Sequence, residues 1–72
     1  MVLLKDLKSI LFISEIVTVY DETDRFEGVV TFYGKVKDIP QKLDNCIVYN
    51  IFINANEELS ICIKNNKKTL DK

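Results

Sequence analysis

The sequence contains no histidine and no tryptophan, and it has only two glycines, two cysteines and one proline among its 72 residues. Without histidine, the chain lacks the commonest general base, the commonest zinc ligand and the usual sensor of pH near neutrality. The shortage of glycine and proline, combined with 47% hydrophobic residues, argues against a disordered segment. We therefore expect a folded chain, and its length allows one domain only.

The two cysteines, Cys46 and Cys62, are too few for the disulfide framework of a small secreted protein. If Asn54–Glu58 forms a turn, Cys62 lies opposite Asn50, four residues and roughly 13 Å along the strand from Cys46, which is too far for a disulfide. The chain also shows neither a secretory signal nor a membrane span. These features predict a reduced, cytoplasmic protein without membrane contact.

Ten Lys and Arg residues stand against eleven Asp and Glu residues, and the formal net charge is -1. Proteins held on DNA or RNA through phosphates usually carry a marked positive excess. The charge balance therefore disfavours a nucleic-acid partner.

The N-terminal half predicts a helix and a β-hairpin. Leucines and isoleucines spaced by three and four residues indicate an amphipathic helix over Val2–Phe12. β-Branched and aromatic residues indicate a strand over Glu15–Tyr20, followed by a polar turn over Asp21–Glu27 and a second strand over Val29–Lys37. Gly34 inside this second strand marks a bulge, a bend or a close approach by another backbone.

The C-terminal half predicts one turn of helix near Pro40 and a second hairpin. Its strands are Cys46–Ile53 and Leu59–Lys64, with Ile53 opposite Leu59 and Ile51 opposite Ile61. The polar residues 65–72 are expected to form a frayed tail beyond a single domain of residues 1–64.

Together these elements predict an α+β fold, in which the N-terminal helix packs on a curved, mainly antiparallel four-stranded sheet that approaches a small open barrel. The expected core consists of apolar residues that share one face of each element. These are Leu3, Leu7, Ile10, Leu11, Val30, Phe32, Val36, Ile47, Ile51, Ile53, Leu59, Ile61 and Ile63.

The residue types needed for catalysis do not occur in a recognisable pattern. The acidic residues of the Asp21–Glu27 turn do not fit a calcium loop, because Thr23 and Arg25 occupy its third and fifth positions. A cysteine nucleophile would have no histidine base, and Gly28 and Gly34 do not form a phosphate-binding loop. We therefore predict a non-enzymatic protein with no cofactor and no metal.

One alternative is a surface for single-stranded nucleic acid. Tyr33 is an aromatic residue on a strand with Lys35 and Lys37 beside it, and such a group can stack a base and contact phosphates. In that case the affinity would fall steeply with added salt.

A second expectation concerns the sheet face opposite the core. Val29, Tyr33, Val48 and Phe52 are predicted to form an apolar patch there, with Cys62 beside them, and we take the first four as partner-binding candidates. A two-fold homodimer would cover the patch and add the burial that a short chain lacks. Further curling of the sheet or a different protein partner would cover it equally well.

The stretch Phe32–Pro40, followed by Leu43, Asn45, Cys46 and Val48, resembles a pattern in small uncharacterised proteins encoded by phages and prophages of AT-rich Gram-positive bacteria. The similar layout covers about residues 2–64. The resemblance supplies no catalytic residue. It implies a phage-borne protein that binds a host protein or a component of a host defence system inside the host cell.

Overall fold

The computed structural model describes residues 1–23 and 28–65, which form a single five-stranded sheet with one short α-helix and two 3-10 helices. In chain order the elements are β1 (Val2–Leu3), α1 (Leu4–Lys8), β2 (Ile16–Asp21), β3 (Val29–Lys35), η1 (Val36–Asp38), η2 (Gln41–Leu43), β4 (Ile47–Ile53) and β5 (Leu59–Lys64). The predicted turn residues 24–27 and the predicted tail from residue 66 onward lie outside the described residues.

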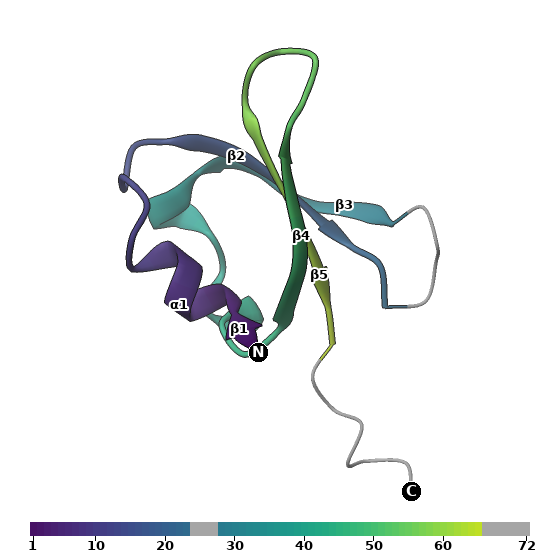
Figure 1. The fold of residues 1–72 in the computed structure, drawn as a ribbon. Coiled ribbons are helices and arrows are strands. Elements are labelled where there is room, and N and C mark those ends of the chain that lie inside the picture. The colour runs from purple at the N-terminus through teal and green to yellow at the C-terminus, as the bar shows by residue number, and fades with distance from the viewer. Residues whose placement is uncertain (24–27, 66–72) are drawn as a thin grey trace, which may run out of the picture.

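The predicted α+β class is confirmed, and the sheet is open, strongly curved and mixed (Figure 1). Its strand order is β1-β4-β5-β2-β3. All neighbouring strands are antiparallel except β2 and β5, which are parallel. The sheet has five strands rather than the predicted four, because Val2 and Leu3 form an extra edge strand instead of the first turn of the helix.

The centre of the sheet is β5, a strand of alternating isoleucines in which four consecutive residues from Ser60 to Ile63 are buried. Its neighbour β2 supplies Val17 and Val19, which are fully buried, as are Ile61 and Ile63 of β5. The core extends from there to α1, η1 and the segment around η2. Its buried members are Leu4, Leu7, Val17, Val19, Val36, Ile39, Leu43, Ile61 and Ile63.

The helix is shorter than the predicted Val2–Phe12 at both ends, and its first residues bond to another part of the chain. The amide of Leu4 donates to the carbonyl of Cys46 at 2.9 Å, and the amide of Lys5 donates to the carbonyl of Asp44 at 2.9 Å. The ammonium group of Lys8 lies 2.7 Å from the carboxylate of Asp44. At the other end, the amide of Ile10 donates to the carbonyl of Leu7 at 3.1 Å in a turn, and α1 ends at Lys8. The predicted core residue Ile10 is therefore outside the helix and 77% exposed.

Strand β3 ends at Lys35, two residues before the predicted end, and Val36–Asp38 form the 3-10 helix η1. The register of β3 also shifts: Phe32 lies opposite Val19 and Val30 lies opposite Tyr20, so Thr31 is an extra residue. This bulge places Val30 on the face away from the core. Val30 is 54% exposed, and its predicted core position is wrong.

The predicted C-terminal hairpin is confirmed: Ile53 pairs with Leu59, Ile51 pairs with Ile61, and Asn50 pairs with Cys62. Beyond these pairs Val48 lies opposite Ile63, so Tyr49 is an extra, bulged residue.

The bulge reverses the alternation at the start of β4. Val48 packs against the core, whereas the prediction put Val48 on the opposite face and Ile47 in the core. Ile51 and Ile53 were also predicted in the core, but they are 47% and 63% exposed, because this end of β4 extends past the shortened helix. The core predictions for Leu7, Val36, Ile61 and Ile63 are confirmed, and Leu11, Phe32 and Leu59 pack partly buried against the core.

Gly34 is the site of a close approach, but the approaching group is the side chain of Phe32 and not another backbone. Its φ of +153° is rare for residues with a side chain, and a Cβ atom there would lie 3.1 Å from Cζ of Phe32. The Phe32 ring therefore covers the glycine backbone. The bulge itself is at Thr31 and not at Gly34.

The full burial of Ile61 at the centre of the sheet gives a first prediction. Replacing Ile61 with Ala should lower the free energy of unfolding by about 3 kcal/mol, because the rigid surroundings leave a cavity. Ile13→Ala is the matched control, because the Ile13 side chain is 67% exposed. This substitution should change the free energy of unfolding by less than about 0.5 kcal/mol. Urea denaturation measures the free energy of unfolding of both variants, and equal decreases would contradict the central position of Ile61.

Candidate protein-binding groove

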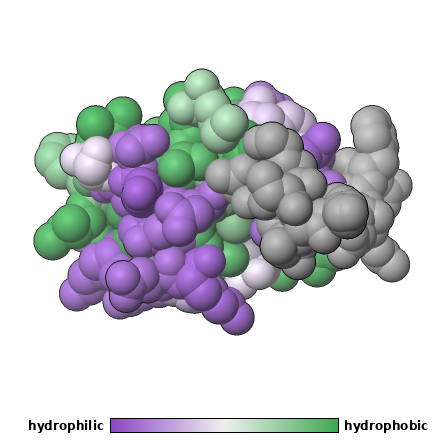
Figure 2. Space-filling view, turned by 90° about the horizontal axis from the view of Figure 1, so that it is seen from below, coloured by the Kyte–Doolittle hydropathy of each residue, from purple (hydrophilic) through white to green (hydrophobic). Residues whose placement is uncertain are grey.

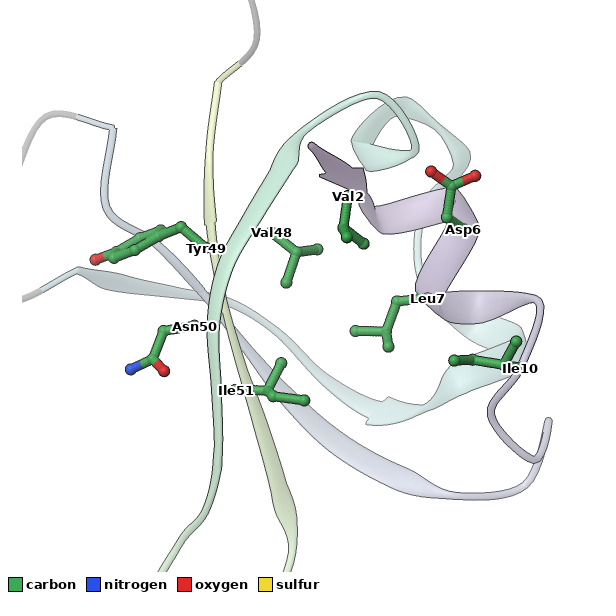
Figure 3. A pocket seen from close by; sticks show the side chains of 8 residues that line it. All are labelled: Val2, Asp6, Leu7, Ile10, Val48, Tyr49, Asn50 and Ile51. Carbon is green, nitrogen blue, oxygen red and sulfur yellow. The ribbon is translucent and has the colours of Figure 1, made fainter.

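An apolar groove of about 470 Å³ lies between the N-terminal segment and β4 (Figure 3). We call it the α1–β4 groove. It is lined by Val2, Asp6, Leu7, Ile10, Val48, Tyr49, Asn50 and Ile51. Figure 3 shows Val48 and Ile51 on β4 pointing toward Leu7 and Ile10, whereas Tyr49 and Asn50 point to the other side of the strand.

The groove follows from the two local features that the sequence pattern did not reveal. The bulge at Tyr49 turns Val48 to the same side of β4 as Ile51. The early end of α1 leaves Ile51 without a helix above it, so Ile51 and Ile10 remain 47% and 77% exposed. Side chains of the core, such as Leu7 and Val48, thus also form the floor of an open groove.

The lining of the groove suits an apolar side chain better than a charged group. Asp6 is the one ionisable acid in the lining, and its carboxylate accepts a hydrogen bond from the amide of Leu3 at 3.2 Å. Within residues 1–23 and 28–65, no group of three or more His, Cys, Asp or Glu side chains is placed to hold a metal ion.

Strand β4 also has an unpaired outer edge beside the groove. β1 pairs with Ile47 and Val48 only, and no other described residue pairs with the outer side of β4 from Asn50 to Ile53. Figure 1 shows this end of the β4–β5 hairpin projecting away from the helix. Its backbone is therefore accessible to an added strand.

The four partner-binding candidates do not form one surface. Tyr33 and Phe52 are 62% and 44% exposed, and Val29 is 49% exposed at the start of β3. Val48 lies on the core side and lines the groove, and Cys62 is buried. The expectation of one apolar patch that includes Val48 and Cys62 is wrong, because the bulge at Tyr49 turns Val48 away from it.

The residues of the nucleic-acid alternative are also separated. The hydroxyl of Tyr33 lies within hydrogen-bond distance of the Glu58 carboxylate, at 3.3 Å. Lys35 ends β3, whereas Lys37 belongs to η1 and its amide donates to the carbonyl of Ile13. The three side chains therefore do not follow one strand, and a carboxylate lies beside the aromatic ring.

Hydrophobic side chains reach the surface elsewhere as well. Figure 2, seen from below Figure 1, shows hydrophobic side chains on the side of α1 next to a group of hydrophilic ones. Phe12 and Ile13 in the segment after α1 are 80% and 67% exposed. Apolar exposure thus continues from the groove along the N-terminal part of the chain.

Both cysteines are free, and neither thiol is activated. Burial raises the pKa of Cys62 to about 11, and a hydrogen bond with Glu22 and the charge of Glu22 act in the same direction. Burial, with a smaller effect of the Asp21 charge, also raises the pKa of Cys46. Both groups remain protonated thiols near neutral pH, which is the unreactive form.

Comparison of the chain with protein-family models, with curated proteins and with solved structures finds no match in any of the three. Among the described residues, no helix has the length and apolar character required to cross a bilayer.

The contact between Glu22 and Cys62 gives a second prediction. The amide of Glu22 donates to the carbonyl of Ile63 at 2.8 Å, which holds Glu22 beside β5. Glu22→Gln should lower the pKa of Cys62, because the charge that opposes thiolate formation is removed. The ultraviolet absorbance of the thiolate against pH measures this in a Cys46→Ser background. Glu58→Gln is the control, and an unchanged pKa in Glu22→Gln would contradict the contact.

The same thiol makes stability depend on pH. The folded-state pKa of about 11 lies above the 9.0 of an unperturbed cysteine, so the folded protein holds this proton more tightly than the unfolded chain. The resulting stabilisation is fully present below pH 9 and is lost as the pH rises toward 11. The free energy of unfolding should therefore fall less steeply over this range in Cys62→Ala than in the wild type, as urea denaturation at several pH values would measure.

Proposed function

We propose that this protein is a non-enzymatic protein-binding module that binds its partner at the α1–β4 groove. The observation that carries the proposal is the open apolar groove beside an unpaired strand edge. A partner segment added along β4 would form main-chain hydrogen bonds with the strand and place alternate side chains over Ile51 and Ile10.

The expected gain in binding free energy comes from the burial of apolar surface. Complete burial of one aliphatic side chain contributes roughly 1.5–3 kcal/mol. Ile10 and Ile51 are both largely exposed in the free protein, so both gain burial when the groove is filled. Asp6 at the groove adds a place for a donor from the partner.

The finer proposal is that the module is a phage-borne modulator of a host protein or of a host defence system. Its support is the sequence resemblance over about residues 2–64 and the shortage of catalytic residue types. The groove is the surface on which a host protein would bind.

Site-specific photo-crosslinking tests the groove. A photo-crosslinking phenylalanine analogue at Ile10 should yield a discrete protein adduct, because Ile10 lines the groove and is 77% exposed. The same analogue at Tyr33, on β3 and 62% exposed, is the control and should not yield that adduct.

A second substitution shows whether the adduct depends on the groove. Ile51→Lys should abolish the adduct formed from Ile10, because it puts a charge among apolar side chains. Val30→Lys, at a similarly exposed apolar residue on β3, should leave the adduct unchanged. An adduct that forms from Tyr33 alone, or that persists in Ile51→Lys, would contradict binding at the groove.

A further inference from the structure

Among the residues that the structure describes, the backbone groups at the outer edge of β4 have no partner at defined residues. The amide of Asn54 donates to the carbonyl of Glu58 at 2.8 Å, so the backbone of Asn54 faces β5. Along an antiparallel strand the direction of the backbone groups alternates from residue to residue. The N–H and C=O groups of Ile51 and Ile53 therefore point away from β5, toward the open edge.

This edge carries no charge. From residue 47 to residue 56 the sequence contains no Asp, Glu, Lys or Arg. Exposed strand edges are normally protected from pairing by charged residues or by proline. The opposite edge of the sheet, β3, carries Lys35. An uncharged edge lets two identical strands approach without like-charge repulsion.

The edge is also complementary to itself. If two copies of β4 pair antiparallel across a two-fold axis at Phe52, Ile51 of each copy lies opposite Ile53 of the other. Both residues direct their N–H and C=O groups outward, so each Ile51 can exchange both main-chain hydrogen bonds with Ile53 of the second copy. Pairing about this axis thus gives the outward backbone groups of Ile51 and Ile53 hydrogen-bond partners.

The side chains agree with this register. Ile51 and Ile53 lie on one face of β4 and Phe52 on the other. The pairing places isoleucines against isoleucines on the groove side and Phe52 against its own copy on the opposite side. The exposed fractions of 47%, 44% and 63% at residues 51, 52 and 53 describe the apolar surface that would be covered.

We propose that the partner bound at this edge is a second copy of the chain, which forms a two-fold dimer with a sheet continuous across β4. The inference rests on the proposed function, because Ile51 belongs to both the groove and the edge. In the dimer the second copy occupies the edge of β4, so a host protein would bind through the rest of the groove, at Val2, Leu7 and Ile10.

Light scattering on the purified chain tests the dimer directly. The wild type should reach twice its 8.3 kDa mass as concentration rises. Ile53→Lys should raise the dissociation constant on the order of 100-fold, because symmetry applies the lost apolar contact twice. Val30→Lys, on the other edge strand, is the matched control and should stay a dimer. Circular dichroism checks that both variants keep the fold.

A disulfide across the axis tests the register. Directly opposite residues without mutual hydrogen bonds have Cα atoms about 4.5 Å apart, which permits a disulfide. Phe52→Cys should therefore form a covalent dimer on mild oxidation, in a background of Cys46→Ser and Cys62→Ala. Tyr33→Cys in the same background is the control and should form no covalent dimer.

The outcomes separate this inference from the proposed function. A wild-type mass of 8.3 kDa at every concentration, or a dimer that persists in Ile53→Lys, would overturn the dimer. A covalent dimer from Tyr33→Cys but not from Phe52→Cys would overturn the register and the edge together. In each of these cases an Ile51-dependent adduct from Ile10 with another protein would still support the groove.

Discussion

The parallel pairing of β2 with β5 is the interaction on which the rest of the structure depends. It joins the β2–β3 hairpin to the β4–β5 hairpin, and an isolated two-stranded hairpin is only marginally stable in water. Val19 lies opposite Ile61 and Val17 lies opposite Leu59 across the two strands, and the side chains of Val17, Val19 and Ile61 are fully buried. The helix, η1 and η2 then close the core around this contact. Every surface of the molecule is therefore positioned by the register of one strand pair.

The C-terminal hairpin could be predicted from sequence because its evidence is local. A polar turn between two runs of alternating isoleucines fixes which residues face each other, and Ile51 and Ile61 do so. The parallel pairing of β2 with β5 leaves no comparable signal, because its partners are about forty residues apart in the chain. The start of α1 could not be predicted for the same reason, since the amides of Leu4 and Lys5 bond to residues 46 and 44.

The groove could not be predicted, although most of its apolar residues were singled out. Periodicity shows which side of an element is apolar, but it does not show whether another element covers that side. Ile10 and Ile51 were therefore assigned to the core, and Val48 was assigned to the wrong face because of the bulge at Tyr49. The ammonium of Lys64 lies 4.7 Å from the centroid of the Tyr49 ring, a cation–π contact that favours the bulged arrangement.

The position of β5 has a consequence for the folding of the protein during its synthesis. β5 is the central strand of the sheet but, among the described residues, the last strand in chain order. A nascent chain that has not yet released residues 59–64 from the ribosome can form local turns, yet Val17 and Val19 have no strand to cover them. The core thus assembles late, when nearly the whole described chain is free, and mostly through long-range contacts that are slow to form. Until β5 arrives, the apolar face of β2 is open to chaperones and to other unfinished chains.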